Sequence, residues 1–217
     1  DDVNRGWFVG KDISAIWDHE FIGIWQEDEA EEAAKYGQQP GDAKVRDVNG
    51  DYKITQEDKV FLGQETPKFR WSFRNEFTLF RNWDISLNLY SQMGHKQSTT
   101  EYLNFFDNLG DYSNTYKREY WTPENKSNSY ARLKSTRPSN INPKKVINKG
   151  FIRLENISVS YRVPQQFARK LMAKEISIYG TVRNVAVWAF DKEWDYWDPE
   201  TKGLLPRTFT FGASITF

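Results

Sequence analysis

The sequence lacks several residue types on which common kinds of functional site depend. Among 217 residues there is no cysteine, which excludes disulfide frameworks, thiolate metal sites and cysteine nucleophiles. The 2 histidines, His19 and His95, lie far apart, so histidine metal sites and Ser-His-Asp triads are poorly supplied. Acidic pairs are abundant, but no spacing singles out a catalytic dyad. We therefore expect no enzymatic activity.

The charge balance and the hydrophobic runs exclude two further classes of protein. Lys and Arg number 30, as do Asp and Glu, so the net charge is zero and nothing indicates a nucleic-acid partner. No run approaches the ~18 consecutive apolar residues of a transmembrane helix. Membrane-spanning strands are not excluded by this, because they alternate their apolar residues with polar ones.

Aromatic residues, in contrast, are abundant: 15 Phe, 11 Tyr and 9 Trp make up 16% of the chain. Aromatic girdles at two membrane interfaces would account for this share, and so would sugar-binding platforms. The clearest pattern is RTFTFGASITF at 207–217, in which one face of an extended strand carries Phe209, Phe211, Ile215 and Phe217. Such a strand is typical of the closing strand of a transmembrane β-barrel. We expect these four side chains to face lipid, with Phe217 at the periplasmic edge.

Other alternating segments are longer than ordinary strands. Residues 69–80 and 83–92, joined by a tight turn at Arg81–Asn82, predict a hairpin. Its arms match the ~9–11 residues that cross a membrane, against ~5–6 in an ordinary strand. A second hairpin is predicted at 151–163 and 175–188, with room for one helical turn in its connector. Its alternation breaks near Arg153 and Glu155, which indicates a bulge or a strand that projects beyond the bilayer.

The connectors between these segments alternate in length. The turn at 81–82 and the connector 164–174 are short, whereas 27–66, 95–149 and 191–206 are long and polar. Outer-membrane barrels show this asymmetry, with the short connectors on the periplasmic side. Within the first long loop, residues 30–36 predict a short helix, and residues 7–25 are expected to supply one more strand.

These observations predict an all-β fold: about six antiparallel strands of a transmembrane barrel, with long extracellular loops. Eight strands are near the practical minimum for a closed barrel, and lipid does not tolerate open strand edges. We therefore expect other strands, from this chain's protein or another, to complete the barrel. Arginines on the polar strand faces are expected to face the lumen: Arg70, Arg74, Arg162 and Arg183.

An Asp-rich segment resembles a calcium loop. Asp47, Asn49, Asp51 and Asp58 take its first, third, fifth and twelfth positions, and the Lys53 carbonyl takes the seventh. Two residues depart from the pattern, because Tyr52 replaces the usual glycine and Asp58 replaces the bidentate glutamate. The alternative is an Asn-Gly turn in an acidic surface loop. Ca²⁺ is the one cofactor that the sequence suggests.

Aromatic residues also gather in two of the long loops. The first group, Trp194, Tyr196 and Trp197, stands among acids, and the second includes Tyr102 and Phe106. Aromatic platforms beside carboxylates suit sugar rings or peptides, so these residues are candidates for contact with a substrate or with a partner protein. Packing of the loops on one another is the simpler interpretation, and both remain open.

Taken in order, several stretches resemble the carboxy-terminal part of a SusC/RagA-type TonB-dependent outer-membrane transporter. Together they cover nearly the whole chain, and their order and spacing are far more specific than any single motif. They are GWFVGKDISAIWDHEFIGIWQEDEAEEAAKYGQQPGDAKVRDVNGDYKIT (6–55), FLGQETPKF (61–69), YWTPEN (120–125), GFIRLENISVSYRVP (150–164), YGTVRNVAVW (179–188), WDPE (197–200) and PRTFTFGASITF (206–217).

The resemblance implies a barrel of about 22 strands with a plug in its lumen. Residues 1–217 would form one segment of that barrel, without the plug or the earlier strands. It also implies a location in the outer membrane of a Gram-negative type of cell, lipid around the barrel and a SusD-like surface lipoprotein as a lid. Import of oligosaccharides or peptides would be driven by TonB, which contacts only the family's amino-terminal part.

A different class of protein remains as the alternative. A secreted, soluble, β-rich carbohydrate-binding module with a calcium loop would account for the aromatic residues and for the Asp-rich segment. It would not account for the long strands, the alternating connector lengths or the aromatic pattern at 207–217. The barrel interpretation is therefore favoured.

Overall fold

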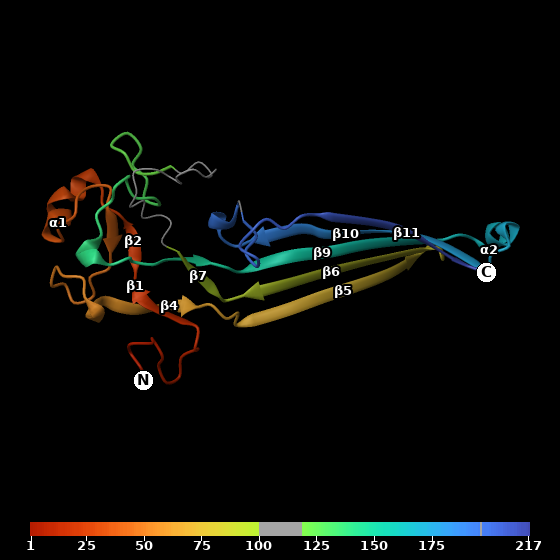
Figure 1. Cartoon of the computed structure of the whole chain (residues 1–217), viewed down its shortest axis with the longest axis horizontal. Coiled ribbons are helices and arrows are strands. Elements are labelled where there is room, and N and C mark those ends of the chain that lie inside the picture. Colours follow the sequence, from red (N-terminus) through yellow and green to blue (C-terminus); the bar gives the residue numbers. More distant parts are fainter. Residues whose placement is uncertain (100–118, 196) are drawn as a thin grey trace. The chain divides into compact units, whose positions relative to one another are not determined.

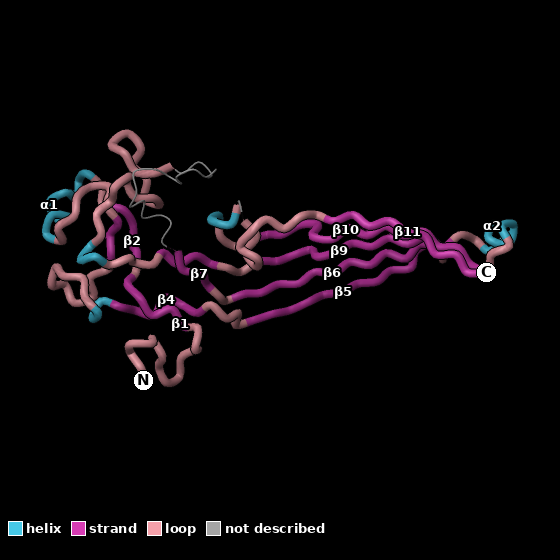
Figure 2. Tube along the Cα trace, viewed as in Figure 1, coloured by secondary structure: helices cyan, strands magenta, loops and turns pink. Residues whose placement is uncertain are grey.

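The structure of the chain is a computed structural model that describes residues 1–99, 119–195 and 197–217. The described residues divide into two compact units, one formed by 1–66 and 96–147 and the other by 67–95 and 148–217. Strands are the main element and helices are short (Figure 2), in agreement with the predicted all-β class. No helix among these residues is long and apolar enough to cross a membrane.

The unit formed by 67–95 and 148–217 is built on one antiparallel sheet, and we call it the sheet unit. Its five strands follow the order β11-β10-β9-β6-β5 and lie side by side along their length (Figure 1). Their bounds are β5 (Phe69–Leu79), β6 (Trp83–Met93), β9 (Phe151–Arg162), β10 (Glu175–Ala189) and β11 (Thr208–Thr216). Both predicted hairpins and the predicted final strand are thus confirmed.

The register of the sheet separates polar from apolar side chains across all five strands. One row joins Arg74, Asn88, Asn156, Arg183 and Thr208 on neighbouring strands. Another row, on the opposite face, joins Phe77, Ile85, Val159, Gly180 and Phe211. Because successive residues of a strand point to opposite faces, the alternation in each segment gives the sheet one polar and one apolar face.

The connectors of the sheet unit confirm the predicted alternation in length. At one end, Phe80 and Arg81 take positive φ angles of 49° and 64° in the tight turn between β5 and β6. At the same end, β9 and β10 are joined by α2 (Gln165–Ala168) and the 3-10 turn η5 (Arg169–Leu171), so the predicted helical turn is present. The opposite end carries the long connector 190–207, which contains the 3-10 turn η6 (Lys192–Trp194).

A bulge lies where the sequence pattern breaks. The register of β9 shifts against β6 between Asn88 and Leu89, and Glu155 has no partner on β6. Beside it, the register of β10 shifts after Arg183, and Asn184 takes a positive φ of 53°. The extra residue reverses the facing of the rest of β9, so that Arg153 pairs with Tyr90 and lies on the polar face.

The unit formed by 1–66 and 96–147 contains small two-stranded sheets. Strand β1 (Ala15–His19) pairs with β4 (Lys59–Gln64), β2 (Phe21–Ile24) with β3 (Ala43–Val45), and β7 (Lys96–Thr99) with β8 (Lys145–Asn148). The short helix α1 (Ala30–Lys35) is as predicted, and the 3-10 turns are η1 (Glu27–Glu29), η2 (Gln56–Asp58) and η4 (Pro138–Asn140). A small core joins distant segments: Ile24, Ala43, Trp121 and Ala131.

The prediction that residues 7–25 supply one more strand is confirmed only in part, because the segment contains strands but none that joins the long sheet. In the described residues this segment forms the short strands β1 and β2, which pair with β4 and β3 and not with the long sheet. The ring of Trp17 packs against Phe8 and Phe61, with centroids 5.0 and 4.6 Å away. Its aromatic residues therefore contribute to a local core and not to an apolar sheet face. The strand number of the complete barrel stays a prediction.

Candidate functional site

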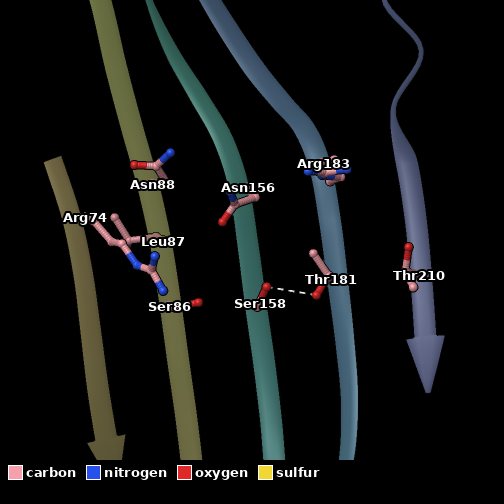
Figure 3. A pocket seen from close by; sticks show the side chains of 9 residues that line it. All are labelled: Arg74, Ser86, Leu87, Asn88, Asn156, Ser158, Thr181, Arg183 and Thr210. Carbon is pink, nitrogen blue, oxygen red and sulfur yellow. Dashed lines mark hydrogen bonds between the residues drawn. The ribbon is translucent and has the colours of Figure 1, made fainter. Parts of the chain in front are cut away.

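The polar face of the long sheet carries a shallow hollow of about 410 Å³ (Figure 3). Its lining comes from all five strands: Arg74, Ser86, Leu87, Asn88, Asn156, Ser158, Thr181, Arg183 and Thr210. The hydroxyl groups of Ser158 and Thr181 lie 2.8 Å apart and share a hydrogen bond. A second hollow of about 480 Å³ shares Ser86, Ser158 and Thr181 and continues toward the short connectors. The polar face thus presents a continuous row of hydroxyl and amide groups.

Charge on the polar face is partly neutralised by one ion pair within a strand and one between strands. Arg74 lies 2.5 Å from Glu76, and Arg162 lies 3.0 Å from Asp84. Arg183, in contrast, has no ion-pair partner among the described residues. All four arginines that the sequence assigned to the polar strand faces are on this face, as their cross-strand partners show. Hydroxyl, amide and guanidinium groups can bind sugar hydroxyls or peptide amides, both of which offer many acceptors.

A buried network holds the β10–β11 connector against this face. Arg153 is 2% exposed, and its Nη2 donates to Asp198 Oδ2 at 2.6 Å. The Tyr90 hydroxyl donates to Glu200 Oε2 at 2.6 Å, and Gln92 Nε2 donates to Glu200 Oε1 at 3.1 Å. Two carboxylates of the connector are therefore bound by three side chains of β6 and β9. We call this set the loop anchor.

The loop anchor predicts how the connector responds to acid. Burial raises the pKa of Asp198, but hydrogen bonds from Arg153 and from backbone N–H groups outweigh it, so the pKa lies below 3.8. A lowered folded-state pKa means that the stabilisation is complete above pH 3.8 and is lost as the pH falls below it. We expect hydrogen exchange at the amides of residues 198 and 200–203, corrected for its intrinsic rate, to stay constant from neutral pH to about 4 and to accelerate below.

The control for this prediction is Asp198→Asn. In that variant the connector should exchange faster at neutral pH, and the acid transition should become smaller because one of the two carboxylates of the loop anchor is gone. Opening of the wild-type connector well above pH 4 would contradict the prediction.

The opposite face of the sheet is apolar and exposed. Exposed large side chains stand on it from four of the five strands, β5, β6, β10 and β11: Phe73, Trp83, Ile178, Phe209 and Phe211, the last 80% exposed. Phe211 packs over Gly180, where an added Cβ would lie 3.3 Å from the ring. A soluble monomer rarely exposes so continuous an apolar surface, and this surface extends over strands of membrane-spanning length.

The sequence of the chain is similar to those of known membrane receptors. No family model matches the chain. TonB-dependent receptor P26 of Formosa agariphila is 25% identical over 234 residues, which cover 99% of this chain and 24% of that protein. TonB-dependent receptor P3 of the same organism is 23% identical over 227 residues, covering 96% of this chain and 22% of that protein. The chain therefore spans about a quarter of the length of these curated relatives.

Solved structures show the same fold. The RagAB peptide importer in its open-open state matches 94% of this chain and 22% of its own, with a TM-score of 0.62 at 15% identity. In its closed-closed state the TM-score is 0.61 at 17% identity. The predicted resemblance to a TonB-dependent receptor is confirmed. The predicted location in the outer membrane is confirmed with it, and the relatives are named as receptors and importers, not as enzymes.

Two of the residues predicted to contact a substrate or a lid differ in their solvent exposure. Trp194 is buried, and its Nε1 donates to the Asn148 carbonyl at 2.8 Å, so it packs the connector on the sheet unit. Trp197 is exposed, as a contact residue would be. Tyr102, Phe106 and Tyr196 lie outside the described residues.

The Asp-rich segment of the receptor-like chain is closed by its own hydrogen bonds. Asp47 accepts from the backbone N–H groups of Gly50 and Tyr52 at 2.7 and 2.9 Å. Asp58 is fully buried and accepts from the N–H groups of Val48 and Thr55 at 2.9 and 2.7 Å. Tyr52, in the position usual for glycine, takes a positive φ of 63°. In the described residues, no three His, Asp or Glu side chains are grouped for metal binding.

The calcium hypothesis stays a prediction, which titration calorimetry of the full-length protein can test. We expect Ca²⁺ to bind with a dissociation constant of about 10⁻⁴–10⁻³ M, as in extracellular modules, and Mg²⁺ to bind much more weakly. Asp47→Asn combined with Asp51→Asn should abolish the heat of binding, because it removes two carboxylate donors. Glu57→Gln, a neutralisation in the same loop outside the predicted donor set, is the control. No binding by the wild-type protein would refute the hypothesis.

Sequence reasoning missed the loop anchor. Its two carboxylates belong to the WDPE stretch, which the resemblance already contained, and Arg153 marks the break in alternation. A buried arginine facing an acidic connector could have been inferred from these two signals together. The sequence does not show which strands pair, and strand pairing is what brings Arg153, Tyr90 and Glu200 together.

Proposed function

We propose that the chain forms part of the wall of an outer-membrane importer that takes up oligosaccharides or peptides. The observation that carries this proposal is the two-faced sheet. Its apolar face suits lipid, and its polar face, with hollows lined by hydroxyl, amide and guanidinium groups, suits a hydrated lumen. Binding energy in such a protein comes from loops and lumen, and no bond is made or broken.

The relatives support two further parts of this proposal. The curated relatives are named TonB-dependent receptors, and we propose that import here is likewise energised through TonB, contacted by segments other than residues 1–217. The RagAB peptide importer carries two components in its name, which supports a SusD-like lipoprotein lid on the long connectors. The remainder of the barrel and its plug would complete the lumen.

The experiment combines solubility with nutrient use. Full-length protein should require detergent or lipid to stay folded and monodisperse, and deletion of its gene should abolish growth on one class of oligosaccharides or on peptides as sole nutrient. Reintroducing the wild-type gene should restore growth. The same gene should not restore growth in cells that lack TonB. Protein that stays folded and monodisperse in plain buffer would instead indicate a soluble carbohydrate-binding module.

A further inference from the structure

We propose that the connector between β9 and β10 is a membrane-interface anchor that inserts into a phospholipid leaflet and binds anionic headgroups. This inference rests on the proposed function, since it requires the apolar face of the sheet to contact lipid. It concerns α2 and η5, which lie at the end of the sheet where β11 also ends (Figure 1).

The packing of the connector places it on the lipid side of the sheet. Ala168 and Ala173 are buried against Ile176, and Val163 packs on the same cluster. Ile176 pairs with Ile215 on β11, so it belongs to the apolar face and not to the polar one. The connector therefore covers the rim of the apolar face and leaves the polar face open. A connector that closed the lumen would have packed on the other side.

The connector exposes three large apolar side chains that nothing in the described residues covers. Leu171 is 66% exposed and Met172 is 87% exposed, and Phe167 is exposed beside them. The neighbouring turn adds an exposed Phe80, and Asn82 of that turn donates to the Arg162 carbonyl at 2.7 Å. Exposed apolar side chains at the rim of a membrane-spanning sheet are positioned to enter the acyl region below the headgroups.

The charges of the connector identify the partner as an anionic lipid surface. Between 164 and 174 it carries Arg169, Lys170 and Lys174 and no acidic residue, in a chain whose net charge is zero. Lys170 Nζ lies 5.7 Å from the Phe167 ring centroid, so cation and apolar side chains share one surface. Basic residues around inserted apolar ones are the features by which interfacial segments bind anionic membranes.

Fluorescent labels at single cysteines test the inference in the full-length protein, made otherwise cysteine-free and placed in phosphatidylglycerol–phosphatidylcholine nanodiscs. The label sites are Leu171→Cys in the connector, Ile178→Cys on the apolar face and Asp195→Cys in the β10–β11 connector. Brominated lipid should quench the first two labels roughly twofold and leave the third unchanged. At the label on residue 171, brominated phosphatidylglycerol should quench more strongly than brominated phosphatidylcholine. Neutralising Arg169 and Lys170 to Gln should reduce this difference roughly twofold.

The outcomes separate this inference from the proposed function. Quenching at 178 but not at 171 would overturn the anchor and leave the importer standing. A label at 171 that is shielded from aqueous iodide and also unquenched by lipid would show that a protein covers the connector, which would overturn the anchor too. No quenching at 178 would remove the proposed function itself, because the apolar face would then not contact lipid. Equal quenching by both lipids in the wild type would overturn the headgroup preference.

Discussion

Replacing Arg153 by Ala is expected to release the β10–β11 connector from the sheet, with a loss of about 3–5 kcal/mol in its local stability. The arginine is 2% exposed, and Asp198, its partner at 2.6 Å, is also buried. Removing the cation leaves a buried carboxylate without its counter-charge, which costs far more than the pair contributes. Glu200 loses a cation 3.4 Å away in the same step. Hydrogen exchange of the amides of residues 198 and 200–203 measures the free energy of opening.

A second arginine on the same face provides the matched control. Arg162 pairs with Asp84 at 3.0 Å, but both side chains are about half exposed, at 45% and 40%. An exposed pair of this kind contributes ~0–1 kcal/mol, so Arg162→Ala should leave the connector unchanged. Similar costs for the two variants would mean that the loop anchor does not hold the connector. Arg153→Lys should restore part of the loss, since it keeps the charge but not the planar group of donors.

The strands could be predicted from the sequence because their signal is local. Alternation with period two can be recognised without knowing which strands pair. The five long strands could therefore be predicted, and so could the bulge at Glu155: they are β5, β6, β9, β10 and β11. The polar and apolar faces follow from the same pattern. The lengths of the connectors then place the short ones at one end of the sheet.

The loop anchor could not be predicted in the same way, because it joins residues far apart in the chain. Glu200 meets Tyr90 across 110 positions, and only the order of the strands brings them together. The pairing of the strands in segment 7–25 could not be predicted for a related reason. Its aromatic residues resemble those of a membrane strand, but Trp17 finds Phe61 on β4 and builds a small core with it. Composition does not distinguish an aromatic residue that faces lipid from one that faces another ring.

Substitution of Phe211 by Arg is expected to cost ~2–4 kcal/mol in folding free energy if the side chain faces the middle of the bilayer. In the structure, Phe211 is 80% exposed and is the cross-strand partner of Gly180, which has no side chain to cover the ring. For a soluble protein, a substitution at so exposed a position should change stability by no more than ~0.5 kcal/mol. The two interpretations of the chain therefore predict effects that differ several-fold at one residue. Reversible unfolding of the full-length protein in lipid vesicles measures the difference.

The polar face of the same strand provides the control, because an arginine can be placed on either face of β11. Ser214 pairs with Ser177 on β10 and belongs to the polar face. Ser214→Arg places the charge in a hydrated lumen, so its cost should stay below ~1 kcal/mol, whereas Phe211→Arg forces a guanidinium among acyl chains. A large cost at 211 with a small cost at 214 requires lipid on the apolar face. Small costs at both would show that water bathes the whole strand, and the importer would then be the wrong interpretation.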